Sequence, residues 1–293
     1  MTAGDDVDGA AAATKQDRRR HLDATENDAL RQAANWFILA AGTANVIMQL
    51  SRPAVAYGVM ESKVDEGSLF KNPKRRARTT TAYIAVTMLG GADERAAMRR
   101  ATNASHARVR SEPGHPVGYN AFDPALQKWV AACLYLGAEQ ACERVHGPLG
   151  GAFAERFYQQ GSVFGTTLQL PPDAWPRSRD AFEEYWRDSL ADLTIDPTTR
   201  QYLMRIVRRE YLGRRVPARL LRLRQRLVAS YLGPDFRALM QLPWTDADAR
   251  SFDSFNRRLG RLMRLVPVAV REAPLRRSLR DVQRRLEEGR PLF

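Results

Sequence analysis

The chain has 293 residues, of which 44% are hydrophobic and 27% charged. This is enough to bury a core without disulfides or structural metals, which argues against a small disulfide- or zinc-stapled protein. The two cysteines, Cys133 and Cys142, lie nine residues apart in one predicted helix and are expected to be packing residues rather than a bridge. The acidic start of the sequence lacks the pattern of a secretory signal, so we expect a cytoplasmic protein.

The formal net charge of +13 is concentrated in the last third of the chain. Residues 1–200 carry 24 basic and 24 acidic side chains, whereas residues 201–293 carry 22 arginines, no lysine and nine acidic side chains. The positive electrostatic field of this region attracts phosphate groups, either in nucleic acid or in anionic lipid. An arginine-rich helical surface that simply faces water is the alternative interpretation.

Helical patterns dominate the first half of the chain after a tail without apolar periodicity at residues 1–33, which we predict to be disordered. The apolar stretch at 35–50 is shorter than the roughly 20 residues needed to span a bilayer, so we interpret it as part of a buried helix. Asp123 and Pro124 have the residue types of a helix N-cap and first helical position. Helices are predicted at residues 35–52, 75–90, 93–110 and 124–145.

The second half of the chain is also predicted to be helical, and no stretch of strand length alternates apolar and polar residues. The predicted helices cover residues 153–161, 178–190, 196–213, 217–231 and 246–265, and the final stretch at 273–288 is very polar. We therefore expect an all-α fold, with a tail at 1–33, one helical domain at 34–275 and a polar C-terminal extension at 276–293.

The four histidines are the first candidates for a metal or catalytic site. His21 lies in the tail, His115 in a loop and His146 at a predicted helix end, so only His106 lies inside a strong helix pattern. On pattern alone, an isolated histidine at a helix edge is more often a packed or surface residue than a ligand. Small and apolar residues at helical spacing beside His106 would leave room for a flat macrocycle; they are Met98, Ala101, Thr102, Ser105 and Val109.

A second candidate surface is the helix predicted at residues 75–90. Arg76, Thr80, Tyr83 and Thr87 share one face of it and could line a site. An amphipathic helix with a salt bridge and a buried tyrosine hydroxyl explains the same pattern without a site. The sequence contains no cysteine pair at zinc spacing, no His-Glu-x-x-His, no Walker loop and no Gly-x-Ser-x-Gly motif.

Four segments carry a resemblance to a known family. They are residues 42–59 (GTANVIMQLSRPAVAYGV), 72–83 (NPKRRARTTTAY), 106–110 (HARVR) followed by 119–130 (YNAFDPALQKWV), and 232–244 (LGPDFRALMQLPW). In this order they resemble the latex-clearing rubber oxygenases and MpaB-type oxygenases. The resemblance covers roughly residues 35–275.

The resemblance implies a globin-like helical domain with flanking helices that holds a haem b through one histidine. The matching histidine is His106, which would bind the iron through a neutral imidazole nitrogen. Arg76 and Thr80 match the family's arginine and threonine near the haem and are the catalytic candidates. With Tyr83 on the same helix face, they are expected to form the cofactor pocket, where Arg76 would pair with a haem propionate or polarise oxygen.

The implied reaction is a dioxygen-dependent oxidation of an apolar, isoprenoid- or lipid-like substrate. We expect the pocket to be apolar and built around Trp36, Phe37, Met48, Trp129 and Tyr135. The chain departs from the family in two places. Met60-Glu61-Ser62 stands where many relatives have a His-Ser pair, and Thr79 before Thr80 gives no match to the distal acid and lysine of rubber-cleaving members, so polyisoprene cleavage is not indicated.

Two other functions remain open on the sequence, namely a non-catalytic haem or lipid carrier on the same fold and an arginine-rich nucleic-acid-binding protein. Specific nucleic-acid binding is not expected, because no recognition helix or aromatic stacking platform is evident. The arginine-rich third is instead expected to associate peripherally with anionic membranes. Its leucines interleaved with arginine, which would face a bilayer or a core, are Leu220, Leu221, Leu223 and Leu227.

Overall fold

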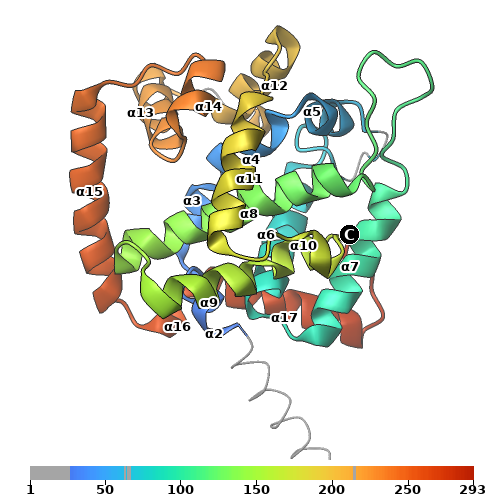
Figure 1. The fold of residues 1–293 in the computed structure, drawn as a ribbon, viewed down its shortest axis with the longest axis horizontal. Coiled ribbons are helices and arrows are strands. Elements are labelled where there is room, and N and C mark those ends of the chain that lie inside the picture. The colour runs from blue at the N-terminus through green and yellow to red at the C-terminus, as the bar shows by residue number, and fades with distance from the viewer. Residues whose placement is uncertain (1–26, 63, 65–66, 214–215) are drawn as a thin grey trace, which may run out of the picture.

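The computed structural model describes residues 27–62, 64, 67–213 and 216–293. Within these ranges the regular secondary structure is helical, and the only β pairing is an isolated bridge between Arg110 and Asn120 (Figure 1). The all-α prediction is confirmed, while the globin-like arrangement stays an expectation. No helix in the described ranges is long and apolar enough to cross a bilayer.

Most of the tail predicted at residues 1–33 lies outside the described residues. Its last part forms the short helix α2 (Asp28–Arg31), in which Ala29 and Leu30 are fully buried. The backbone N–H of Leu30 donates a hydrogen bond to Oε1 of Gln160 at 2.9 Å. This end of the segment is therefore packed into the fold, and the other domain boundaries stay a prediction.

The central helix is α8 (Pro124–His146), which crosses the middle of the molecule (Figure 1). Its start was predictable because the Asp123 carboxylate accepts hydrogen bonds from the backbone N–H groups of Ala125 and Leu126, the arrangement of an N-cap. The helices that pack most extensively against it are α3 (Trp36–Ala40), α4 (Gly42–Leu50), α10 (Val163–Thr166) and α15 (Asp246–Leu265).

A polar side chain fixes the approach of α4 to α8. Asn45 is buried, and its amide donates to the carbonyl of Cys133 at 2.5 Å, which satisfies a group that would otherwise be costly to bury. Gly137 on α8 lies against the same amide, where a Cβ atom would overlap it. Cys133 and Cys142 are both buried and unbridged, as predicted.

The helices that surround the candidate site are α5 (Pro53–Met60), α6 (Pro73–Leu89) and α7 (Ala92–His106). Gly90 and Gly91 separate α6 from α7, and the Glu94 side chain accepts a hydrogen bond from the N–H of Gly91 at the start of α7. The helix predicted at 93–110 is four residues too long, because the chain after His106 turns to pair Arg110 with Asn120.

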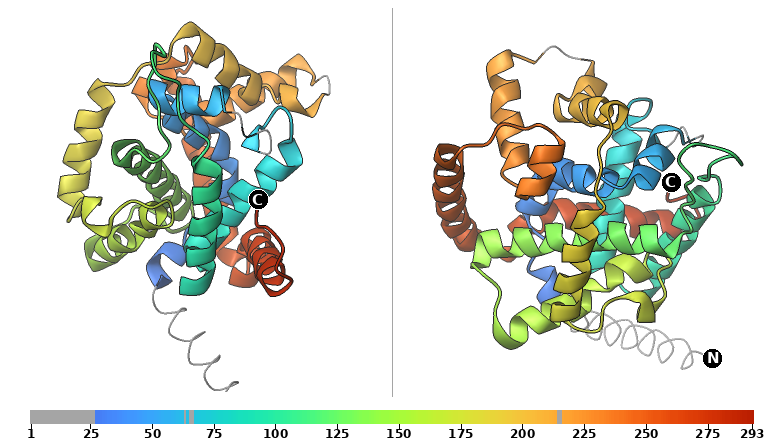
Figure 2. Two further views of the ribbon diagram at one scale, coloured as in Figure 1. Left: turned by 90° about the vertical axis from the view of Figure 1, so that its right-hand side faces the viewer. Right: turned by 45° about the horizontal axis from the view of Figure 1, so that its top comes forward.

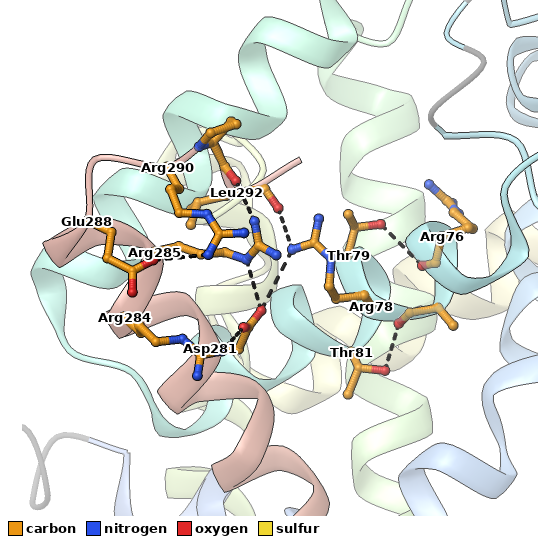
Figure 3. A network of polar contacts seen from close by, with 12 residues as sticks. Arg76, Arg78, Thr79, Thr81, Asp281, Arg284, Arg285, Glu288, Arg290 and Leu292 are labelled. Carbon is orange, nitrogen blue, oxygen red and sulfur yellow. Dashed lines mark hydrogen bonds and ion pairs between the residues drawn. The ribbon is translucent and has the colours of Figure 1, made fainter.

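The C-terminal helix α17 (Ala273–Glu287) packs along α6 (Figure 2). An ionic network joins the two helices: Asp281 of α17 lies 3.0 Å from Arg285 and 3.8 Å from Arg78 of α6 (Figure 3). Arg78 also donates to the carbonyl of Leu292 at 3.0 Å. The segment after α17 is thereby held against α6.

The remaining helices that the sequence predicted are confirmed to within two residues, with one interruption, whereas the elements at Pro172–Ala174, Pro234–Leu239 and Val268–Arg271 were not predicted. The helix predicted at 196–213 is divided, because Arg209 takes a left-handed conformation (φ 57°) between its two parts. The parts are α12 (Pro197–Val207) and the 3-10 turn η3 (Glu210–Leu212). The other elements are α9 (Gly151–Gly161), η2 (Pro172–Ala174), α11 (Arg179–Ala191), α13 (Ala218–Ala229), α14 (Pro234–Leu239) and α16 (Val268–Arg271).

Candidate functional site

A cavity of about 290 Å³ lies between α5, α6, α7 and the first half of α8. Its wall is mainly apolar, as is usual for small-molecule sites. His106, Arg76, Thr80 and Tyr83, which the sequence singled out from two separate helices, all line it. The structure therefore brings the predicted site residues together around one space, while their chemical roles stay predictions.

His106 is the last residue of α7, not an interior residue as the helix pattern indicated. Burial and, as the smaller cause, the nearby positive charge of Arg76 together lower its pKa to about 4. A helix C-terminus favours a cation, so desolvation outweighs the helix dipole here. The imidazole is consequently neutral at pH 7.

The hydrogen bonding of His106 is incomplete. Its Nδ1 atom is buried and has no hydrogen-bond partner among the described residues, and the same holds for the hydroxyl of Thr102, one turn earlier on α7. Buried polar atoms are normally paired, so an unpartnered nitrogen needs a reason. A neutral imidazole that lines an apolar cavity has the chemistry of a metal ligand, and the unpartnered Nδ1 atom of this imidazole is itself buried.

Arg76 enters the cavity wall from α6. By surface area it is exposed, yet its pKa is lowered because surrounding protein atoms desolvate the guanidinium. The two observations agree if the exposed surface of Arg76 belongs to the cavity that it lines, rather than to the outer surface. Figure 3 shows Arg76 on the opposite side of α6 from Arg78, which extends toward Asp281.

Tyr83 contributes its ring to the cavity and its hydroxyl to the fold. The hydroxyl donates to the carbonyl of Phe164 on α10 at 2.6 Å, and burial raises the tyrosine pKa. Thr80, one turn before it, lines the cavity and is exposed. Thr87, the fourth residue of the predicted face, is fully buried and donates to the Tyr83 carbonyl instead of lining the cavity.

The other described histidines have different surroundings. His115 is 3.1 Å from the carboxylate of Glu61. His146 ends α8, and burial lowers its pKa, with Arg271 and Arg264 adding to the shift. Neither lines the cavity, and His21 lies outside the described residues.

The predicted pocket wall is wrong. Trp36 is 55% exposed on the surface, and the other four aromatic and apolar residues proposed for the wall are buried in the core without lining the cavity. Apolar periodicity predicts which residues are buried, but it does not predict which of them line a cavity. Large buried side chains fill the core. The wall residues that the sequence did not single out include Arg75, Val55, Gln127, Leu134 and Phe293.

These missed residues had little signal in the sequence. Gln127 sits in the first turn of α8, where its amide donates to the carbonyl of Ala121 and to Gln169, contacts that depend on tertiary structure. Gly58 of α5 faces Tyr119, where an added Cβ would make an ordinary van der Waals contact with the ring at 3.4 Å.

The residues present fit a haem held by one protein ligand. The described part of the chain has no group of three or more His, Cys, Asp or Glu side chains that could hold a bare metal ion. The cavity does offer one neutral imidazole, an apolar wall and two arginines, Arg75 and Arg76. Arginine is the side chain best suited to pair with carboxylates such as haem propionates.

Comparison with known proteins identifies the family to which the chain belongs. Residues 30–266 match a family model described as "ER-bound oxygenase mpaB/B'/Rubber oxygenase, catalytic domain". Two uncharacterised proteins, one from Mycobacterium bovis and one from Mycobacterium tuberculosis, are each 46% identical over 226 residues, which cover 76% of this chain and 88% of theirs. No solved structure matches the chain. The chain therefore belongs to the MpaB and rubber oxygenase family and carries its oxygenase catalytic domain.

Proposed function

We propose that this protein is a haem b-dependent oxygenase whose cofactor binds in the cavity between α5, α6, α7 and α8, with His106 as the single iron ligand. The observation that supports the proposal most strongly is the state of His106. Its imidazole is neutral, lines an apolar cavity and has a buried nitrogen without a partner in the described chain, inside a domain of an oxygenase family.

Each of the other site residues has a proposed role. Arg76 binds a propionate or polarises oxygen, and its positive charge also keeps the imidazole deprotonated. Thr80 offers a hydroxyl to the cavity, and Tyr83 supplies an aromatic wall while its hydroxyl ties α6 to α10. When bound, the haem supplies the dioxygen chemistry, and the chain sets ligation, access and electrostatics.

The substrate class rests on the family resemblance, and the mainly apolar cavity wall supports it. The substrate is an apolar molecule of isoprenoid or lipid type, with dioxygen as the second reactant. We place the protein in the cytoplasm. A haem carrier on the same fold would bind the cofactor equally well, but would not consume dioxygen.

The test is the absorption spectrum of the purified protein. We expect a Soret band and a haem that acid–ketone extraction removes, because the sequence lacks a Cys-x-x-Cys-His attachment site. Dioxygen consumption with apolar candidate substrates then separates an oxygenase from a carrier. A colourless protein that also fails to bind added haemin would contradict the proposal.

A further inference from the structure

Helix α15 lies at an edge of the molecule in both Figure 1 and the right-hand view of Figure 2. Leu259 and Met263 pack against the core, and Gly260 approaches the Arg144 carbonyl of α8 so closely that a Cβ would overlap it. Gly260 is the one buried residue of this helix. The rest of α15 is thus left to solvent or to a partner.

An apolar surface occupies the end of α15 and the turn into α16. Residues 265–270 are Leu-Val-Pro-Val-Ala-Val, and all but Val266 are exposed, with Leu265 82% exposed. Trp36 of α3 borders them, because its indole N–H donates to the carbonyl of Val270. We call this surface the apolar corner; it comprises Trp36, Leu262, Leu265, Pro267, Val268, Ala269 and Val270.

The surroundings of the apolar corner are rich in positive charge. Between residues 254 and 271 the sequence has five arginines and no acidic residue. The next acid, Glu272, is buried and paired with Arg31 at 2.9 Å and Arg276 at 2.6 Å. No ion pair joins any described residue to the exposed arginines on the outer part of α15, which are Arg257, Arg258, Arg261 and Arg264.

We propose that the apolar corner docks this protein on the surface of an anionic lipid bilayer. Leu265, Val268 and Val270 enter the boundary between headgroups and acyl chains, while the arginines of α15 contact lipid phosphates. Trp36 has the amphipathic character of residues enriched at that interface. A second copy of the chain is a poorer occupant, because it would bring two arginine-only rims together.

This placement differs from the one that the sequence suggested. On α13, Leu227 packs against the core, Leu221 is half-buried, and only Leu220 and Leu223 are exposed. Two α13 arginines are also engaged: Arg224 donates to the Val207 carbonyl at 2.7 Å, and Arg226 lies 3.1 Å from Asp248. The exposed α13 leucines nevertheless form a matched control, since they too are leucines beside arginines on a surface helix.

The test is flotation of the full chain with vesicles of phosphatidylcholine alone or phosphatidylcholine with phosphatidylserine. We expect binding to the anionic vesicles only, reversed by high salt. The double substitution Leu265→Ser with Val268→Ser should weaken binding by more than about tenfold, since two exposed apolar side chains no longer insert. Leu220→Ser with Leu223→Ser should leave it unchanged. Arg261→Gln with Arg264→Gln should weaken binding at low salt, and Arg219→Gln with Arg222→Gln should weaken it less.

A fluorescent label gives an independent readout. Cys133 and Cys142 are buried, so a cysteine introduced as Val268→Cys is selectively labelled with an environment-sensitive dye. Its emission should shift to the blue on anionic vesicles, whereas the same dye at Leu223→Cys should not shift. The proposal is overturned if the protein does not float at low salt, if both leucine pairs contribute equally, or if sedimentation shows a dimer that only the Leu265 and Val268 substitutions dissociate. None of these readouts depends on haem.

Discussion

The guanidinium of Arg76 acts on the imidazole of His106 across the cavity that both residues line, and after burial it is the second cause of the low pKa of His106. The two residues come from α6 and α7, consecutive helices that contact each other. A short glycine connection therefore brings together a permanent positive charge and a histidine kept neutral. This is the condition in which an imidazole nitrogen can bind iron.

Removing the positive charge of Arg76 should change the titration of His106. With Arg76→Gln we expect the pKa of His106 to rise above about 4 but to stay below 6.5, because burial is the larger cause and remains. The measurement is an NMR pH titration of the apoprotein. Arg100→Gln, on the exposed face of α7, is the control and should leave the titration as it is. An unchanged His106 pKa in the Arg76 variant would contradict the coupling.

The stability of the apoprotein should depend on the protonation of His106. Between pH 6.5 and about 4 the unfolded imidazole binds a proton while the folded one does not, so the free energy of unfolding falls as the pH falls through this window. The effect is at most about 3 kcal/mol. Carboxylates also titrate at low pH, so the quantity to measure is the difference between wild type and His106→Gln in urea unfolding. If the two proteins lose the same free energy of unfolding as the pH falls, the pKa of His106 is not lowered in the folded protein.

Replacing Tyr83 by phenylalanine should separate its structural role from cofactor binding. The variant keeps the ring in the cavity and loses the 2.6 Å hydrogen bond to Phe164. We expect about 1–2 kcal/mol lower stability in urea unfolding, with haemin binding retained. Loss of haemin binding at unchanged stability would instead place the Tyr83 hydroxyl at the cofactor.

The contact between α15 and α8 should be intolerant of a single methyl group. Gly260→Ala places a Cβ on the Arg144 carbonyl oxygen, so the helices must separate, and we expect a loss of about 1–3 kcal/mol in thermal or urea unfolding. Gly42→Ala, at the start of α4, meets no atom within 4 Å and should be neutral or slightly stabilising. Equal stabilities of the two variants would mean that α15 is not held as described.

Local signals made much of the fold predictable. The bounds of α15 matched the prediction because Thr245 and Asp248 form a capping box and the helix is amphipathic. In contrast, the ends of α7 and α12 were missed because tertiary pairing of Arg110 and the left-handed Arg209 override a continuing helical pattern. Local propensity carries no information about such contacts.

The candidate site was predictable only in part. The resemblance pointed to His106, Arg76 and Thr80, and helical spacing added Tyr83; the structure places all four on one cavity. The wall was missed because Trp129 and Tyr135 are conspicuous in the sequence yet fill the core. Phe293 lines the cavity, and the helix before it, α17, packs against α6. These two helices are far apart in the sequence, so their contact has no local signal.

The central claim, that His106 holds the iron of a haem, is tested most directly by titrating haemin into four purified apoproteins: wild type, His106→Ala, His115→Ala and His146→Ala. We expect a Soret band with the spectrum of a histidine-ligated haem in wild type and in the His115 and His146 variants. The His106 variant should lose this spectrum and bind haemin weakly or not at all. A His106→Ala protein that binds haemin with the wild-type spectrum and affinity, while His115→Ala or His146→Ala does not, would contradict the account.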